Sequence, residues 1–385
     1  MKQAKISPGM SRLLRSPPAW LKRGRIGLVT HQAAVLPDGR SSAQALYEHP
    51  EINLAAILGP EHGFFGTAGP GEKVRSRKHP QWKIPVHSLY GENRKPSRKM
   101  MNTLDGIIVD LCDLSARPYT YLSTLHLCLE AAAETGTPIA VADRPVPLPD
   151  TIDGPMVQPG WESFVATTSV PMVYGMTQAE TAKWLIATHA LDVSLHTASM
   201  EGYQRTHTSP GTSYPWIPPS PAIKNWETAT LYTTTVCTEA LPALDCDRHG
   251  PMPFQVLGAP WINGHEFADA LNERLPPSVR TFPYFYRSAT HSRGVQGIRF
   301  SVLKPNTFKP VSTAIIVLAT IRDLYGSRLW TTKGTRPEFF DKLFGSNQTR
   351  LALMDGEDAD HIIRSWRLAH NKYRRSRNKV LLYPS

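Results

Sequence analysis

Short apolar runs alternate with amphipathic stretches through the first half of the chain, a pattern typical of strands that alternate with helices. The run Arg25–Thr30 begins the series, and the stretch 120–134 carries leucines at helical spacing and ends before Gly136. Ser41–Gln44 resembles a capping box for a short helix reaching His49. Such alternation predicts an α/β fold with a mainly parallel sheet. The further predicted strands are 54–58, 84–87, 106–111 and 138–142.

The pattern changes beyond about residue 190. Thr177–Glu180 is a capping box that opens a helix to about His189. The stretch Pro210–Pro221 is dense in proline and serine, and it is interpreted either as a linker or as a buried loop that covers Trp216. The remainder predicts a mixed α+β domain. Its expected elements are a strand at Val295–Val302 and helices near 264–274, 312–325 and 357–375. The expected division is an N-terminal arm (1–23), an α/β domain (24–190) and a smaller C-terminal domain (191–385).

The charge balance allows several anionic partners. Across 385 residues, 43 Lys and Arg face 32 Asp and Glu, a net charge of +11, which attracts nucleic acid, anionic lipid or an acidic glycan. Much of the excess lies in Arg12–Arg25 and Arg364–Lys379, and such runs are usually solvated. The sequence holds no nucleic-acid-binding module, so no nucleic-acid partner is expected.

Cofactors, metals and a membrane span are not expected either. The four cysteines have no zinc spacing, and the histidines form no H-E-x-x-H motif. No run of 18 apolar residues occurs. No apolar h-region precedes Pro17, which predicts a cytoplasmic protein, or a periplasmic or secreted one if the N-terminus is incomplete. The chain also lacks a G-x-G-x-x-G turn and a G-x-S-x-G elbow, and Gly66–Lys73 is not a P-loop.

Candidate chemistry begins at the loop Gly59–Gly66, directly after the apolar run 54–58. Glu61 and His62 stand side by side there between turn-forming residues. Ligands of open α/β sheets bind at the carboxyl ends of strands, so the pair is placed for acid/base catalysis. The alternative is a turn whose two polar side chains face solvent.

Two further apolar runs also end in charged loops. In a parallel sheet these loops converge on one edge, and their mixture of side chains suits a polyhydroxylated or carboxylated ligand. The alternative is that the charges only keep the loops hydrated. The residues concerned are Asp110, Asp113, Arg117, Tyr119, Tyr121, Asp143 and Arg144.

Eight motifs in this order resemble the exo-β-N-acetylmuramidase family, glycoside hydrolase family 171, once catalogued as a domain of unknown function. The resemblance spans roughly residues 24–385. The motifs are Gly27-Leu28-Val29-Thr30, Pro60-Glu61-His62-Gly63, Ser88-Leu89-Tyr90-Gly91, Ala116-Arg117 with Tyr119-Thr120-Tyr121, Asp143-Arg144-Pro145, Gly175-Met176-Thr177, Pro218-Pro219-Ser220-Pro221 and Gly258-Ala259-Pro260-Trp261.

The resemblance implies a Rossmann-like N-terminal domain, a smaller C-terminal domain and an active cleft between them. It implies a bacterial glycosidase of cell-wall turnover that releases terminal N-acetylmuramic acid, or a related N-acetylhexosamine, from peptidoglycan fragments. The family's proposed catalytic glutamate matches Glu61. The chain departs from the family pattern at Asp247-Arg248-His249-Gly250 and at five single positions. These are His31, Phe65, Val146, Tyr174 and Ala222.

Glu61 is expected to act as general acid, with His62 beside it and with Phe64, Phe65 or a nearby carboxylate raising its pKa. Asp110 or Asp113 is the candidate second carboxylate, or else orients His62 and Arg117. A 2-acetamido sugar also permits substrate-assisted catalysis without an enzyme nucleophile.

The remaining predicted site residues bind substrate. Arg117 or Arg144 is expected to hold the lactyl carboxylate of muramic acid, or alternatively to pair with Asp113 or Asp143. Tyr119 and Tyr121 stack on a sugar or pack the helix start. The further predicted substrate-binding residues are Asp143, Glu72, Tyr90 and Glu239. The rival function is a catalytically degenerate protein that keeps the fold and binds carbohydrate or a partner; a phosphate-directed enzyme is a more distant one.

Overall fold

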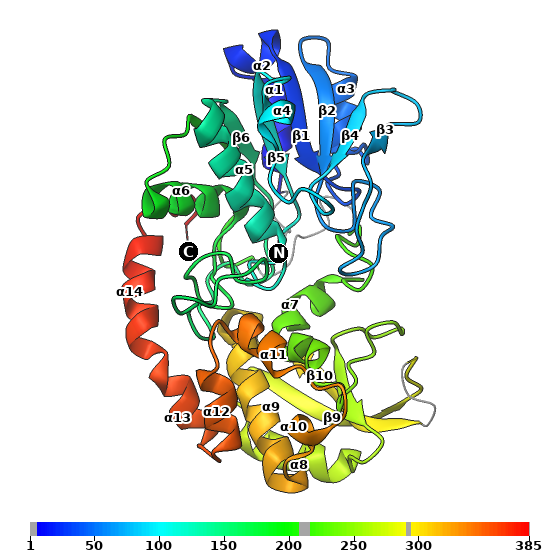
Figure 1. Cartoon of the computed structure of the whole chain (residues 1–385). Helices are drawn as coiled ribbons and strands as arrows, with labels where there is room; N and C mark the ends of the chain where they lie inside the picture. The colour runs from blue at the N-terminus through cyan, green and yellow to red at the C-terminus, as the bar shows by residue number, and fades with distance from the viewer. Residues whose placement is uncertain (1–5, 208–215, 290–293, 385) are drawn as a thin grey trace.

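The computed structural model describes residues 6–207, 216–289 and 294–384, and it divides into a large sheet domain and a smaller domain (Figure 1). The large domain holds a seven-stranded sheet in the order β3-β4-β2-β1-β5-β6-β7. All neighbouring strands are parallel except β3 and β4. The α/β prediction is confirmed. The strands are β1 (Arg25–Thr30), β2 (Asn53–Gly59), β3 (Arg77–Lys78), β4 (Pro85–Ser88), β5 (Gly106–Asp110), β6 (Ile139–Ala142) and β7 (Leu195–Ala198).

The central strands are apolar runs because helices cover both faces of the sheet. Every residue of β5 and β6 is buried. The predicted helix at 120–134 is α5, and Gly136 ends it in the left-handed conformation at φ 66°. Ser41 caps α3 as predicted, accepting a hydrogen bond from the Gln44 N–H at 3.0 Å. The helices of this domain are α1 (Gly9–Arg15), α2 (Ala19–Arg23), α3 (Ser42–Tyr47), α4 (Arg98–Met101), α5 (Tyr121–Thr135) and α6 (Gln178–His189).

The N-terminal arm predicted at 1–23 is wrong over the residues that the structure describes. Residues 6–23 include α1 and α2, whose apolar side chains Met10, Leu13 and Leu21 are buried. Helix α1 contacts β6 and β7, so the segment belongs to the sheet domain. Residues 1–5 lie outside the described part.

The smaller domain pairs a three-stranded antiparallel sheet, in the order β8-β10-β9, with helices. The predicted strand Val295–Val302 and the helix 264–274 are confirmed as β10 and α8. The helix predicted at 357–375 is instead two helices, which meet where the Trp366 N–H bonds the Ile363 carbonyl in a tight turn. The elements are α7 (Trp226–Thr235), η1 (Val236–Glu239), β8 (Val256–Ala259), α8 (Gly264–Arg274), β9 (Val279–Tyr286), β10 (Val295–Val302), η2 (Pro305–Thr307), α9 (Pro310–Tyr325), α10 (Arg328–Thr331), α11 (Pro337–Phe344), α12 (Gln348–Met354), α13 (Ala359–Ser365) and α14 (Arg367–Arg377).

The large domain extends past the boundary predicted at residue 190. Strand β7 pairs in parallel with β6 at the sheet edge, so residues 195–198 belong to the first sheet. The end of the chain also returns to this domain along α14 (Figure 1). Tyr373 Oη donates to the Tyr174 carbonyl at 2.8 Å, and the Leu382 N–H donates to Glu180 at 2.9 Å. The C-terminal segment therefore ties the two domains together.

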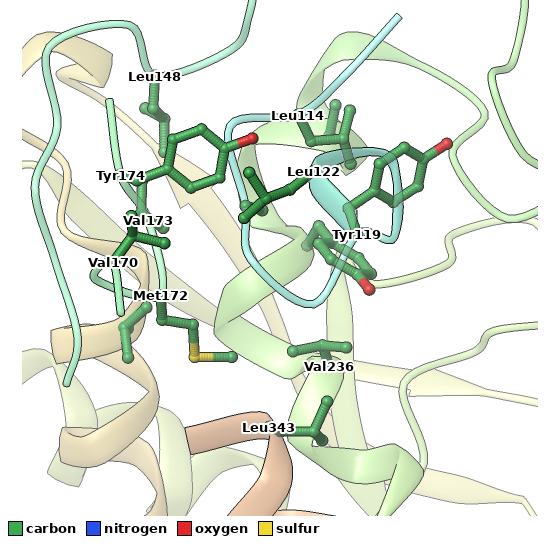
Figure 2. Packing of buried hydrophobic residues seen from close by; sticks show 14 of the residues in the cluster. Leu114, Tyr119, Leu122, Leu148, Val170, Met172, Val173, Tyr174, Val236 and Leu343 are labelled. Atoms are coloured by element: carbon green, nitrogen blue, oxygen red, sulfur yellow. The ribbon is translucent and has the colours of Figure 1, made fainter. Parts of the chain in front are cut away.

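One apolar cluster runs through both domains. Figure 2 shows Leu122 of α5 and Met172 of the long loop after β6, together with Val236 and Leu343 of the smaller domain. All four are at most 1% exposed. Because the interface is packed like an interior, the two domains are held as one unit.

The proline-rich stretch Pro210–Pro221 lies partly outside the described residues, which exclude 208–215. In the described remainder, Trp216 is half-buried and packs edge-to-face on Trp226. Its Nε1 donates to the Ile223 carbonyl at 3.3 Å. These contacts support the buried-loop interpretation for residues 216–221.

Candidate active site

A cavity with a volume of about 720 Å³ lies where the two domains meet. The loop after β2 and the start of α5 form one wall, and residues from η1 to α11 form the other. A concave site at the carboxyl ends of parallel strands is the usual ligand position in such sheets. The predicted site residues that line it are Glu61, His62, Tyr90, Tyr119, Tyr121 and Glu239.

Glu61 is fixed at the cavity by two hydrogen bonds. Its Oε1 accepts from the Gly71 N–H at 3.0 Å, and its Oε2 accepts from the Thr120 hydroxyl at 2.6 Å. Gly71 belongs to the same loop, whereas Thr120 stands at the start of α5. The carboxyl group is therefore held between the loop after β2 and the start of α5.

His62 adopts the left-handed conformation, with φ of 69°, and is buried beside Glu61. Its Nδ1 lies 2.8 Å from the Ala68 carbonyl oxygen. A carbonyl oxygen only accepts, so Nδ1 carries a proton, and in the neutral ring Nε2 remains an acceptor. The ring braces the loop that carries Glu61.

The opposite wall carries a second carboxylate. Glu239, in η1, forms an ion pair with Arg248 at 2.7 Å. Burial raises the pKa of Glu239, the charge of Glu61 raises it further, and Arg248 opposes both effects. Burial and then the charge of Glu61 raise the pKa of Tyr90 to about 12. Two carboxyl groups therefore act on one cavity from opposite walls.

Five cationic side chains line the cavity, and the prediction from sequence assigned a site role to none of them. The Arg94 guanidinium stacks on Phe164 at 4.4 Å and on Tyr90 at 5.5 Å. The sequence marks only Arg248 among them, because this residue falls in the segment 247–250, where the chain departs from the family pattern. The others lie in stretches without a motif. The five are Arg94, Lys224, Arg248, Arg336 and Lys342.

Arg144 and Asp110 are not cavity residues, which corrects both predicted site roles. They form a fully buried ion pair, with Arg144 Nε donating to Asp110 at 2.5 Å and Nη2 donating to it at 3.0 Å. Arg144 also donates to the Val35 carbonyl and to the Ser42 hydroxyl. Because its guanidinium N–H groups donate to buried acceptors, Arg144 does not bind a substrate carboxylate.

Arg117 is likewise interior. Its guanidinium donates to three backbone carbonyl oxygens, those of Pro155, Val170 and Leu343, at 2.7–2.8 Å. Burial lowers the pKa of Arg117 to about 9. The predicted lactyl clamp is therefore wrong for this residue, because its guanidinium binds the loop after β6 to α11.

Asp113 and Asp143 are buried away from the cavity, which corrects their predicted roles. Asp113 accepts from Tyr174 Oη, and burial raises its pKa to about 6. Asp143 accepts from the Thr177 hydroxyl at 2.7 Å and the Ala179 N–H at 3.0 Å, so it caps the start of α6. Burial, and then the charge of Glu180, raise the pKa of Asp143 to about 7.

Three predicted neighbours of Glu61 also point elsewhere. Glu72 is exposed and accepts from the Gly69 N–H at 2.7 Å, outside the cavity lining. Phe64 and Phe65 pack edge-to-face on each other, and both rings contact His79. Neither phenylalanine lines the cavity that Glu61 faces.

The five single departures from the family pattern lie mostly outside the cavity, whereas the segment 247–250 contributes Arg248 and His249 to its lining. Ala222 lines it, whereas His31, Val146 and Tyr174 are buried in the interior. His31 accepts from the Cys112 N–H at 3.0 Å, and burial lowers its pKa to about 3. Tyr174 donates to Asp113. Phe65, on the loop that carries Glu61, packs against Arg77 and His79 and does not line the cavity.

Within residues 6–207, 216–289 and 294–384, no cluster of three His, Cys, Asp or Glu side chains could hold a metal ion. A search of the same ranges finds no helix with the length and apolarity needed to cross a bilayer.

Comparison with known proteins covers the whole fold. Residues 26–227 and 230–383 match, respectively, the N-terminal and C-terminal parts of the family described as exo-beta-N-acetylmuramidase NamZ. The chain is 33% identical over 388 residues to the peptidoglycan beta-N-acetylmuramidase NamZ of Bacillus subtilis (strain 168), covering 99% of this chain and 92% of that protein.

Two crystal structures of DUF1343 family proteins from Bacteroides fragilis are also similar. The first superposes with a TM-score of 0.92 at 29% identity, covering 99% of this chain and 100% of the other. The second superposes with a TM-score of 0.74 at 24% identity, covering 99% of each chain. The second supports the fold alone.

Proposed function

This chain belongs to the exo-beta-N-acetylmuramidase NamZ family, and from that premise we propose that it releases terminal N-acetylmuramic acid, or a related N-acetylhexosamine, from peptidoglycan fragments with Glu61 as general acid. Family membership makes it a bacterial glycoside hydrolase, a peptidoglycan β-N-acetylmuramidase. The observation that carries the finer proposal is the Glu61 carboxyl group, held by Gly71 and Thr120 at the cavity between the domains.

In the proposed step, protonated Glu61 gives its proton to the glycosidic oxygen as the bond to the muramic acid breaks. The leaving sugar thereby departs as a neutral alcohol. The hydrogen bonds from Gly71 and Thr120 hold the two carboxyl oxygens in place throughout. His62 supports the loop through its bond to Ala68.

For a two-carboxylate mechanism, we assign the second carboxylate to Glu239 instead of Asp110 or Asp113. Those aspartates are interior, whereas Glu239 lines the cavity opposite Glu61. In a substrate-assisted reaction the 2-acetamido group attacks the anomeric carbon instead. Glu239, held by Arg248, would then orient that group.

The lactyl carboxylate of muramic acid needs a cationic partner, and Arg94 replaces Arg117 and Arg144 in that role. Arg94 lines the cavity from the Glu61 side, above the Tyr90 and Phe164 rings. Stacking leaves the edge of a guanidinium available for a bidentate bond with a carboxylate.

The test is to incubate the purified protein with a muramic-acid-containing disaccharide and with a chromogenic muramide, and to measure released sugar. Release of N-acetylmuramic acid from the non-reducing end supports the proposal. Retained activity in a chelator supports a metal-free reaction. Inactivity on a panel of amino-sugar glycosides would contradict the proposal and favour a binding protein that keeps the fold.

A further inference from the structure

A strongly basic segment lies directly beyond the loop that carries Glu61. Residues 73–83, called here the basic hairpin, contain β3 and turn back into β4 in antiparallel register. Five cationic side chains of this segment are exposed, and none forms an ion pair with a residue in the described part of the chain. The five are Lys73, Arg75, Arg77, Lys78 and Lys83.

The basic hairpin is joined to the active site by Val74. The Val74 N–H donates to the Tyr90 carbonyl at 2.8 Å, and Tyr90 lines the cavity. The Val74 side chain also lies close to Gly63. A Cβ added at Gly63 would stand 3.0 Å from Val74 Cγ1. The position of the cations is therefore set by the same two loops that form the Glu61 wall.

Stacked rings hold the hairpin in shape. The Arg77 guanidinium lies 4.1 Å from the centre of the Phe65 ring. His79 stacks on Trp82 at 3.9 Å, and Trp82 stacks on Tyr47 at 4.7 Å. Cations on a braced backbone lose less conformational freedom on binding than cations on a free loop. A solvated charge run without a role would not require this bracing.

The positive surface continues toward the cavity through Arg94. Arg94 is exposed at the cavity lining, four residues after the Tyr90 that bonds Val74. A substrate that extends out of the cavity on this side meets cations from Arg94 to the hairpin. An anionic chain is the complementary ligand.

We propose that the basic hairpin binds the carboxylates carried by the muramic acid units and stem peptides of a glycan strand whose terminal sugar occupies the cavity. This inference rests on the proposed function, and it extends it from the cleaved sugar to the polymer behind it. A strand carries more carboxylates beyond its terminal sugar than a disaccharide does, so the hairpin is expected to add affinity mainly for strands. The contacts are exposed and ionic, so salt weakens them.

The test variant combines Lys73→Gln, Arg75→Gln and Lys78→Gln. None of these side chains makes a polar or ring contact within the described residues, so folding is expected to be unchanged. The matched control combines Arg367→Gln, Lys372→Gln and Arg375→Gln, three exposed cations of α14 on the opposite side of the molecule (Figure 1). The control removes the same charge without touching the hairpin.

Two readouts are measured at low and at high salt. One is kcat/KM on stem-peptide-bearing glycan strands and on the disaccharide, and the other is co-sedimentation with insoluble peptidoglycan. For the hairpin variant, kcat/KM on strands should fall about tenfold at low salt. This is the size expected when three exposed ionic contacts are lost together with their electrostatic attraction of the anionic strand. Its disaccharide kinetics and the strand kinetics of the α14 control should remain unchanged. The difference should shrink at about 0.5 M salt, where charges are screened beyond a few ångströms.

Equal loss on strands and disaccharide would overturn the inference, because the hairpin would then act through the cavity. Equal loss in the α14 control would overturn it as well, because net charge alone would explain the effect. Loss of binding to a phosphate-rich wall polymer, with strand binding intact, would assign the surface to that polymer instead. If the wild type cleaves no muramic glycoside, the proposed function fails, while co-sedimentation still tests the hairpin.

Discussion

At the scale of single residues, the proposed reaction depends on the Glu61 proton. Glu61→Gln keeps the volume. Its amide oxygen can still accept from the Gly71 N–H, and its NH2 group can donate to the Thr120 hydroxyl oxygen, which reverses that second hydrogen bond. Without a proton to donate, turnover should fall roughly 100-fold or more, the scale of general acid catalysis. The loss should be smaller on substrates with good leaving groups, which need less protonation. Steady-state kinetics on a pair of substrates with different leaving groups measures both effects.

Glu72→Gln is the matched control, since Glu72 is an exposed carboxylate of the same loop outside the cavity. It should retain nearly full activity. Substantial turnover of a poor leaving group by Glu61→Gln would disprove the assignment, and Glu239 would become the candidate acid because it lines the same cavity.

Asp143 predicts a pH dependence of stability. Its native pKa of about 7 lies above the ordinary value of 3.8, so the folded protein binds more protons than the unfolded chain between these values. Its contribution is therefore fully present below about pH 4 and is lost as the pH rises through 7. Asp143→Asn cannot titrate, so the stability advantage of the wild type over this variant should shrink from pH 4 to pH 7.5.

Urea denaturation of both proteins across this range measures that difference. The groups facing the carboxyl group include Glu180, Thr177 and Tyr383, and they remain in the variant. A difference that stays constant or widens with pH would show that the Asp143 pKa is not raised.

At the scale of elements, the start of α6 joins a helix cap to the sheet. The Glu180 carboxylate accepts from the Thr177 N–H at 2.9 Å, the reciprocal half of the predicted capping box, and the Thr177 hydroxyl donates to Asp143 at 2.7 Å. Thr177→Ala should lower the free energy of unfolding by about 1–2 kcal/mol, the range for a lost N-cap hydroxyl. Chemical denaturation measures the loss.

Thr177→Ser keeps the hydroxyl and should recover most of that stability, because serine caps as well as threonine. If the serine variant were as unstable as the alanine variant, the methyl packing of Thr177 rather than its hydroxyl would be the stabilising part.

At the scale of the whole molecule, Arg117 joins the two domains from within. Replacing it by methionine leaves the carbonyl oxygens of Pro155, Val170 and Leu343 without their buried donor. Destabilisation by about 3 kcal/mol or more is expected, because buried acceptors lose charged partners. Denaturant unfolding measures it, and hydrogen exchange should show faster opening of α11, which contains Leu343.

Arg364→Met is the control, an exposed arginine of α13 whose loss should cost less than 1 kcal/mol. Equal effects of the two variants would argue against the interior role of Arg117. The apolar cluster shared by both domains further predicts a single cooperative transition for the wild type.

The sequence by itself determined strands β1, β2, β4, β5, β6 and β10, several helices, and that Glu61 follows a buried strand. Strand β1 and helix α8 were predicted at the bounds that the structure has, because buried strands are short apolar runs and helix starts carry recognisable caps. Local signals miss elements held by distant contacts. Strand β7 is only partly buried, and α1 depends on packing against β6 and β7.

Only the tertiary structure decided which strand-end charges face the cavity. Asp110 and Arg144 follow buried strands much as Glu61 does, yet they neutralise each other in the interior across 34 residues of sequence. Glu239 and Arg248 reach the cavity because the second domain folds over the sheet edge. Residue type and spacing show that a charge ends a strand. Whether it meets substrate or a buried partner depends on what the rest of the chain packs against it.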